Sequence, residues 1–178
     1  MPTRKPLHGH VSRGHSKHSK LPQNHCFACG KDNPHGMHLK FYIDEAKRVA
    51  TCNVKLTRRY QGPPGHAHGG IIAVILDEAM GKINKLSNVI ALTKSMNIEY
   101  LKPVPLGELL TVTARAESIN GREHTNLAEI CNQAGEVLAR SSGLFIAVDV
   151  ARMFSKFIDS SAGRGAPNIG SPNNPSRR

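Results

Sequence analysis

The sequence predicts an α+β domain in which a curved antiparallel β-sheet wraps around one long helix. Residues 69–86 are apolar on nearly every side, which is typical of a buried helix. Segments of alternating apolar and polar residues lie on both sides of it in the chain, and this alternation is typical of strands. Because so apolar a helix is poorly suited to an outer surface, we expect the sheet to curl around it.

Two strands are predicted before the helix, at residues 38–44 and 48–56, where apolar and polar residues alternate. The residues expected on the buried face of the second strand are Ala50, Cys52, Val54 and Leu56. A turn-rich segment then leads into the helix.

Four strands are predicted after the helix, at residues 90–102, 108–119, 123–133 and 136–149. Asn120-Gly121 is a strong hairpin signal between the second and third of these, and Gln133-Ala134-Gly135 predicts the next turn. Four consecutive long strands can pair as an antiparallel meander. With the single buried helix, this is the outline of the hotdog fold. A short closing helix is expected at residues 150–158.

The chain of 178 residues is expected to hold one folded domain, residues 23–158. Residues 1–22 read as a disordered, basic, His-rich arm, and residues 159–178 as a disordered tail rich in Gly, Pro, Ser and Asn. The net charge is +11, and residues 1–20 contribute five cations and no acid: Arg4, Lys5, Arg13, Lys17 and Lys20. The basic character belongs mainly to the arms, so we do not expect a nucleic-acid partner.

Targeting signals are not evident in the sequence. It has no run of eighteen apolar residues, so no membrane span is expected, and its basic start is not followed by the apolar stretch of a secretory signal. We therefore predict a cytoplasmic protein. Its four cysteines are then expected to be reduced thiols.

The start of the predicted helix carries the first candidate chemistry. His68-Gly69-Gly70 precedes the apolar run, and glycines allow another molecule to approach the backbone closely. The first turn of a helix has free N–H groups and a positive dipole end, which suit a carbonyl oxygen that becomes an oxyanion. This pattern indicates a site for acyl transfer.

Two adjacent acids, Asp77 and Glu78, interrupt the helix. Asp77 lies two turns after Gly70, on a face of small residues, where it could act as a general base or as a nucleophile. The alternative is a structural acid satisfied by local hydrogen bonds. Glu78 is rotated by about 100° and is expected to meet Lys82 at i+4 or a partner chain.

Four segments resemble the PaaI-like group of hotdog-fold acyl-CoA thioesterases, in the family's order and over residues 24–149. They are CFACGKDNPHGMHLKF, GPPGHAHGG, HGGIIAVILDEAMG and TKSMNIEYLKPVPLGELLTVTA. The resemblance implies hydrolysis of an acyl-CoA to a free acid and CoA, without a cofactor. It also implies a homodimer or a dimer of dimers, with active sites between protomers.

The resemblance also implies roles for single residues. Asp77 would be the catalytic carboxylate, the Gly70 N–H would polarise the thioester carbonyl, and His68 would sit beside the thioester. Thr93 matches a Ser/Thr position that helps hold the attacking water from the opposite protomer. The expected substrate-binding residues are Gly69, Asn97, Lys94 and Arg59, the last two as cations for the phosphates of CoA. Glu78 is the second candidate for the catalytic acid.

Several alternatives stay open at this point. A non-catalytic acyl-CoA-binding or regulatory module could use the same fold, and a dehydratase or isomerase could use His68 as its base. The segment that contains His25, Cys26, Cys29, His35 and His38 has a zinc-like composition. It lacks a second cysteine pair at finger spacing, and we therefore expect no metal there, with a structural zinc as the alternative.

Overall fold

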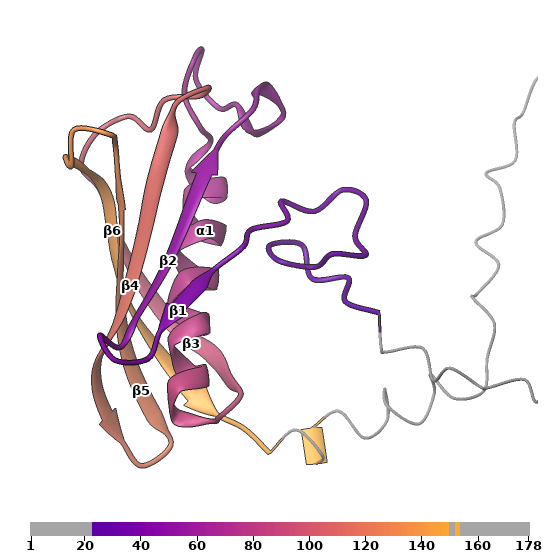
Figure 1. Ribbon diagram of the computed structural model, residues 1–178, viewed down its shortest axis with the longest axis vertical. Helices are drawn as coiled ribbons and strands as arrows, with labels where there is room; N and C mark the ends of the chain where they lie inside the picture. Colours follow the sequence, from indigo (N-terminus) through magenta and orange to yellow (C-terminus); the bar gives the residue numbers. More distant parts are fainter. Residues whose placement is uncertain (1–22, 150–151, 154–178) are drawn as a thin grey trace, which may run out of the picture.

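The computed structural model describes residues 23–149 and 152–153 of the chain. Six strands form one antiparallel sheet in the order β1-β2-β4-β5-β6-β3, and helix α1 lies across one face of it (Figure 1). The strands are β1 (Tyr42–Asp44), β2 (Val49–Lys55), β3 (Ala91–Tyr100), β4 (Leu109–Asn120), β5 (Glu123–Cys131) and β6 (Val137–Ala147). The predicted α+β class and the hotdog arrangement are confirmed.

Helix α1 spans Gly69–Ile83, and a 3-10 turn, Asn84–Ser87, continues it to the predicted end. The residues on its sheet-facing side are buried: Ile72, Ile75, Leu76, Ala79, Met80 and Ile83. Its other side, which includes Ile71 and Val74, is only half-buried. The prediction of a buried helix therefore holds for one side, because the sheet of a single protomer covers that side alone.

The four strands after the helix do not form the simple meander that the sequence suggested. Strands β4, β5 and β6 pair in chain order, but β3 pairs with β6 at the far edge of the sheet. Strand β2 pairs with β4 along seven residues, from Val49↔Arg115 to Lys55↔Leu109, and so occupies the edge that β3 would have needed. Periodicity within a strand does not say which neighbour it will have.

Strand β1 begins at Tyr42, four residues later than predicted. His38 has a positive φ of 54°, which interrupts an extended strand. The N–H groups of Met37 and Leu39 donate to the carbonyls of Phe27 and Ala28, at 2.8 and 2.9 Å. The early residues of the predicted strand are thus paired with the loop before it. The second predicted strand is confirmed, with Ala50, Cys52 and Leu56 buried and Val54 half-buried.

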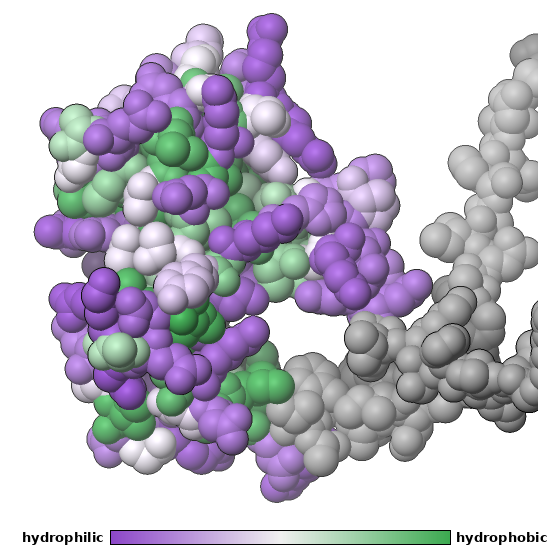
Figure 2. Space-filling view, viewed as in Figure 1, coloured by the Kyte–Doolittle hydropathy of each residue, from purple (hydrophilic) through white to green (hydrophobic). Residues whose placement is uncertain are grey.

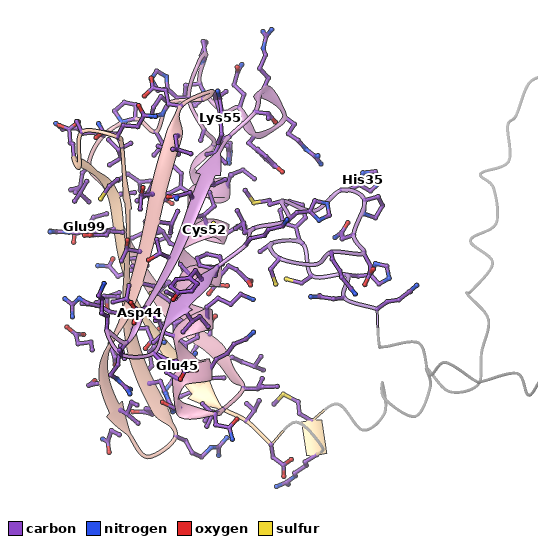
Figure 3. All side chains as sticks on the ribbon, in the orientation of Figure 1. His35, Asp44, Glu45, Cys52, Lys55 and Glu99 are labelled. Carbon is purple, nitrogen blue, oxygen red and sulfur yellow. The ribbon has the colours of Figure 1, made fainter. Side chains whose placement is uncertain are left out.

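The segment before β1 forms a loop, residues 24–39, which we call the cysteine loop. It extends from the sheet beyond helix α1, and His35 lies on its outer part (Figures 1 and 3). Ala28 and Leu39 anchor it in the core, since each is 5% exposed. On the face shown in Figure 2, hydrophobic residues appear in several patches with polar residues between them.

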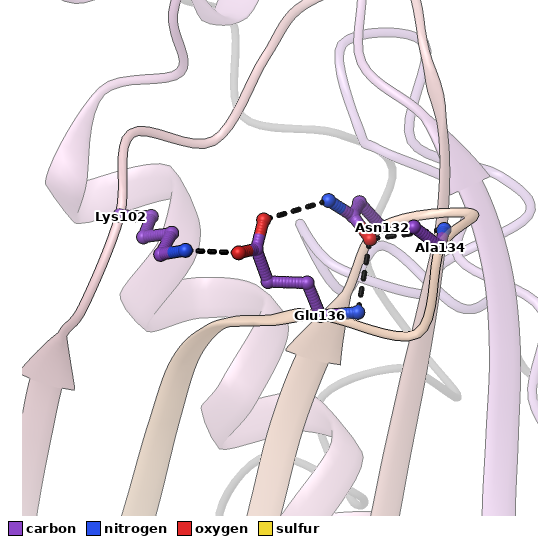
Figure 4. Close-up of polar contacts among 4 residues, drawn as sticks. All are labelled: Lys102, Asn132, Ala134 and Glu136. Atoms are coloured by element: carbon purple, nitrogen blue, oxygen red, sulfur yellow. Dashed lines mark hydrogen bonds and ion pairs between the residues drawn. The ribbon is translucent and has the colours of Figure 1, made fainter.

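The predicted turns are confirmed. Gly121 and Gly135 adopt the left-handed conformation that turns require, with φ of 58° and 78°. At the β5–β6 turn, Asn132 Oδ1 accepts from the backbone N–H groups of Ala134 and Glu136, each at 3.0 Å (Figure 4). The Glu136 carboxylate also pairs with Lys102, which joins this turn to the segment after β3.

Three predictions fall on parts of the chain outside the described residues: the N-terminal arm 1–22, most of the closing helix 150–158, and the tail 159–178. Within the described part, no helix has both the length and the apolar character needed to cross a bilayer.

Candidate functional site

The first turn of α1 is capped by the side chain of His68. The ring Nδ1 accepts a 2.9 Å hydrogen bond from the Gly70 N–H, and the His68 carbonyl accepts from Ile71 and Ile72. The Gly70 N–H, which the resemblance assigned to the thioester carbonyl, is therefore engaged by His68. The Gly69 N–H has no acceptor among the described residues, so it is the donor that the fold leaves free at this end.

Asp77 and Thr93 meet from two different elements. The Thr93 hydroxyl on β3 donates to Asp77 Oδ1 on α1 over 2.6 Å. The carboxylate is half-buried, and the hydroxyl faces it across the space between helix and edge strand. The resemblance implied a contribution of Thr93 from the opposite protomer, whereas the contact here lies within one chain. The hydrogen bond fixes one carboxylate oxygen and leaves Oδ2 for another partner.

An irregularity in β3 lies next to this contact. The pairing of β3 with β6 shifts register between Thr93 and Ser95, so Lys94 stands outside the regular ladder. Bulges of this kind redirect neighbouring side chains and are common beside functional sites. Thr93 lies at this shift, and its hydroxyl reaches Asp77 on the helix.

Asp77 and Thr93 line a cavity of about 290 Å³ between α1, the 3-10 turn and β3. Two cations, Lys82 and Lys85, also line it, and Ile90, Leu92 and Phe145 supply apolar wall. The cavity thus combines an acid held by a hydroxyl with cations and an apolar wall. Such a cavity can accommodate a charged ligand that also has an apolar part. The cavity opens to solvent beside the edge strand.

Glu78, the residue after Asp77, lines the same cavity. Its Oε1 pairs with Lys82 at 2.6 Å, which confirms the predicted i+4 pair. Both side chains are largely buried, at 16% and 17% exposed. Lys82 Nζ also donates to Cys29 Sγ at 3.1 Å, and Cys26 Sγ lies 3.8 Å from Glu78 Oε2. The cysteine loop is thus attached to the helix beside the cavity.

Protonation in this cluster follows from burial and charge. Burial and the neighbouring Glu78 raise the pKa of the Cys29 thiol. The pKa of Lys82 is also raised, because burial, which lowers it, is outweighed by its contacts with Glu78 and Cys29. Both groups therefore hold their protons at neutral pH, as a thiol and an ammonium.

The other predicted binding residues lie apart from Asp77. Lys94 pairs with Glu123 at 3.5 Å on the surface, and the Asn97 carbonyl accepts from Ser141. Arg59 donates to the His35 carbonyl at 2.8 Å and so holds the cysteine loop. Gly69 accepts a hydrogen bond at its carbonyl from the Tyr100 hydroxyl at 3.2 Å. The structure therefore unites Asp77 with Thr93 but leaves Lys94, Asn97 and Arg59 outside that cavity.

Sequence reasoning missed three features of this region. Lys85 lines the cavity, although the sequence pattern did not indicate it; it follows Gly81 by one helical turn and Asp77 by two. The other two are the contact of Tyr100 with Gly69 at the helix start and the contact of Lys82 with Cys29. The first joins residues separated by 31 positions in the chain, and the second joins residues separated by 53. No local pattern in the sequence signals contacts across such separations.

Comparison with known proteins shows which family the central part of the chain resembles. Residues 64–139 match the family model described as Thioesterase superfamily. This stretch includes the helix start, Asp77 and Thr93. Together with the sheet and helix described above, the match shows a likeness to that superfamily over less than half of the chain.

Curated relatives match part of the chain. The chain is 30% identical over 115 residues to rat acyl-coenzyme A thioesterase THEM4, covering 64% of this chain and 50% of that protein. It spans about half the length of the curated relatives it matches.

Solved structures show the same fold. A thioesterase superfamily protein, RHA08564, has a TM-score of 0.66 and 32% identity, covering 69% of this chain and 60% of its own. The Escherichia coli PaaI protein from the phenylacetic acid degradation operon has a TM-score of 0.59 at 21% identity, covering 64% of this chain and 81% of its own. The latter likeness shows the fold alone.

Proposed function

We propose that the protein is an acyl-CoA thioesterase in which Asp77 is the general base. In the reaction, water adds to the thioester carbonyl, its proton passes to the Asp77 carboxylate, and the C–S bond breaks. The free acid forms, and the CoA sulfur leaves and takes up a proton. The match of residues 64–139 to the Thioesterase superfamily model and the curated acyl-CoA thioesterase relatives support the reaction class.

The Thr93–Asp77 hydrogen bond carries the proposal. Asp77 receives its short 2.6 Å hydrogen bond from the edge strand, and both residues line a cavity in which a ligand can reach the carboxylate. One oxygen held by Thr93 leaves the other directed to a water, which is the arrangement a general base needs. In this proposal Thr93 positions the carboxylate.

The second half of the site is the free N–H at the helix start. Gly69 and Gly70 lie seven to eight residues before Asp77, which is about 10–12 Å along the axis. A single carbonyl cannot contact both a donor at the helix start and a water on Asp77 over that distance. A complete site therefore needs the helix start of a second protomer, with His68 beside the thioester. The free Gly69 N–H, with the engaged Gly70 N–H as the alternative, would polarise the carbonyl.

Strand β3 is the surface we propose for the homodimer. It is a ten-residue edge strand, whereas β1 at the opposite edge has three residues. Long exposed edge strands tend to pair with another chain. The apolar residues Ile90, Leu92, Tyr100 and Leu101 on and beside it are 42–54% exposed. Pairing of two β3 strands would cover them and bring Thr93 close to the partner.

Cations around the cavity would bind the CoA phosphates. Lys82 and Lys85 line it, and Lys94 stands at the bulge beside Thr93. Arg59, which donates to the His35 carbonyl of the cysteine loop, does not line this cavity and would contribute only from a neighbouring protomer. We propose Lys85 and Lys94 as the principal phosphate contacts, because both are exposed.

The experiment is thioester hydrolysis measured as free CoA thiol released from short, long and aromatic acyl-CoAs. Purified protein is compared with Asp77→Asn, Glu78→Gln and the control Asp44→Asn, which changes an acid on β1. Asp77→Asn is expected to lower kcat by about 10²–10⁴-fold, which is the range of general-base catalysis. Asp44→Asn is expected to keep full activity.

Two results would contradict the proposal. Full turnover by Asp77→Asn would show that Asp77 is not the general base. If Glu78→Gln then lost hydrolytic activity, the role of general base would pass to Glu78. Binding of acyl-CoA without turnover of any substrate by the wild-type protein would instead indicate a non-catalytic binding module. Light scattering and circular dichroism on each variant separate a chemical loss from a loss of dimer or fold.

A further inference from the structure

A cluster of metal-ligating side chains lies where the cysteine loop meets helix α1. The ligand atoms of Cys26, Cys29 and Glu78 all lie within 4.8 Å of one another. Cys26 Sγ and Glu78 Oε2 are 3.8 Å apart. The proposed hydrolysis gives these two thiols no role. The proximity of these thiols to Glu78, about fifty residues away in the chain, therefore needs a separate explanation.

The spacing suits a tetrahedral zinc ion. Zn–S bonds of about 2.3 Å and Zn–O bonds of about 2.0–2.2 Å put neighbouring ligand atoms about 3.5–3.8 Å apart. The observed separations reach that geometry with small side-chain rotations. Two sulfurs and one oxygen give three protein ligands, and water would complete the fourth position. Thiolate sulfur selects zinc over magnesium or calcium.

The loop around the two cysteines is held in a tight turn. The Gly30 N–H donates to the Cys26 carbonyl at 2.9 Å, and Asn24 Oδ1 accepts from the Cys26 N–H at 3.1 Å. A Cβ at Gly30 would lie 2.4 Å from the Cys26 carbonyl oxygen, so only glycine fits there. Backbone contacts of the loop, rather than the thiols, thus fix the two sulfurs on one side of the turn.

Charge balance permits a zinc ion in this cluster. Glu78 and Lys82 form a neutral pair, and the two thiols are neutral while protonated. When one Zn²⁺ binds, each of the two thiols releases one proton. The two positive charges of the ion replace those of the two protons, so the net charge of the cluster stays at zero. Lys82 holds Glu78 Oε1 and leaves Oε2, the oxygen nearer Cys26, for the metal. Its contact with Cys29 Sγ can persist as a hydrogen bond to the thiolate.

We propose that Cys26, Cys29 and Glu78 form a zinc site that fastens the cysteine loop to helix α1, with Lys82 as the outer partner of Glu78. This reverses the expectation from sequence that the segment binds no metal. The sequence presented only the Cys-x-x-Cys pair with nearby histidines, and His25, His35 and His38 are not part of the group among the described residues. The third ligand comes from the helix and could not be inferred by spacing.

The test is binding of Zn²⁺ and Co²⁺ to full-length, reduced protein. The parent protein for this test carries alanine in place of His8, His10, His15 and His18, because the His-rich arm can bind metal by itself. We expect about one zinc per chain after dialysis, and a thiolate-to-cobalt absorption band in the near ultraviolet. Cys26→Ser, Cys29→Ser and Glu78→Gln should each lower zinc affinity at least about tenfold. Cys131→Ser is the matched control and should bind as the parent does.

Stability provides a second readout. Zinc should raise the melting temperature of the parent and of Cys131→Ser, but not that of the Cys26→Ser/Cys29→Ser double variant. Failure of the parent to bind zinc, or a cobalt spectrum without the thiolate band, would overturn the proposal. Equal binding by the double variant would overturn it as well. These measurements do not use thioester hydrolysis, so they stand or fall independently of the proposed activity.

Discussion

The Thr93 hydroxyl on strand β3 donates a 2.6 Å hydrogen bond to the Asp77 carboxylate on helix α1. Removing this hydroxyl should leave the carboxylate free to rotate. We expect Thr93→Ala to lower kcat about tenfold to a hundredfold with little change in KM. Thr93→Ser keeps the hydroxyl and should restore most of the rate. Steady-state kinetics on the best acyl-CoA substrate measure this, and equal activity of the alanine variant would argue against a positioning role.

His68 caps helix α1 through its ring nitrogen. His68→Ala removes the acceptor of the Gly70 N–H and should cost about 0.5–2 kcal/mol in the free energy of unfolding. His68→Asn supplies another capping acceptor and should recover most of that stability. Urea unfolding of the three proteins gives the comparison. A recovered fold without recovered hydrolysis in His68→Asn would assign the ring a further part in the reaction.

Asn126 joins the sheet to the end of the helix. Its buried Nδ2 donates to the Met80 carbonyl at 3.0 Å and to Asn84 Oδ1 at 2.9 Å. Asn126→Leu leaves a buried acceptor without its donor and should cost about 1–3 kcal/mol. The exposed substitution Glu117→Gln on neighbouring β4 should stay within about 0.5 kcal/mol of wild type. Chemical denaturation measures both, and a neutral Asn126→Leu would show that the pair adds no net stability.

Gly143 lets β6 pass directly beneath the helix. A Cβ there would lie 2.9 Å from both Met80 Cε and Phe145 Cε2, so Gly143→Ala should overpack the core and cost about 1–3 kcal/mol. Because Met80 has a flexible end, Met80→Ala should relieve part of the clash. The two changes together should then cost less than the sum of their separate costs. A double-mutant cycle by urea unfolding tests this, and strict additivity would contradict it.

Glu99 and Arg140 face each other across β3 and β6 and pair at 2.8 Å. The hydrogen bond with Arg140 lowers the pKa of the Glu99 carboxyl. A carboxyl whose pKa is lower in the folded state stabilises the fold above its unfolded pKa, about 4.3, and loses that contribution as the pH falls through its folded pKa. The gain should be small because the pair is exposed.

Melting curves of wild type and Glu99→Gln at several pH values check that sign. The two proteins should differ most near pH 7 and converge as the solution becomes acidic. A difference that grows toward low pH would contradict the assignment.

The local pattern of the sequence was enough to place most elements. The apolar run at 69–86 predicted the helix, whose last turn is 3-10 in the structure. Alternation at 48–56 predicted a buried face of which Ala50, Cys52 and Leu56 are buried and Val54 is half-buried. Glycines at 121 and 135 predicted turns because left-handed conformations favour that residue. Asp77 was a candidate catalytic residue because it is an acid in an otherwise apolar helix. The small residues on the same helix face indicated room for a substrate.

Contacts between distant segments were decided only by the tertiary structure. Three such contacts shape the site. Strand β3 pairs with β6, Thr93 bonds Asp77, and Glu78 lies close to Cys26 and Cys29. Periodicity reports whether each residue of a segment faces the core or solvent. Which segments then become neighbours depends on how all the buried faces pack together, and that free energy is shared across the whole domain.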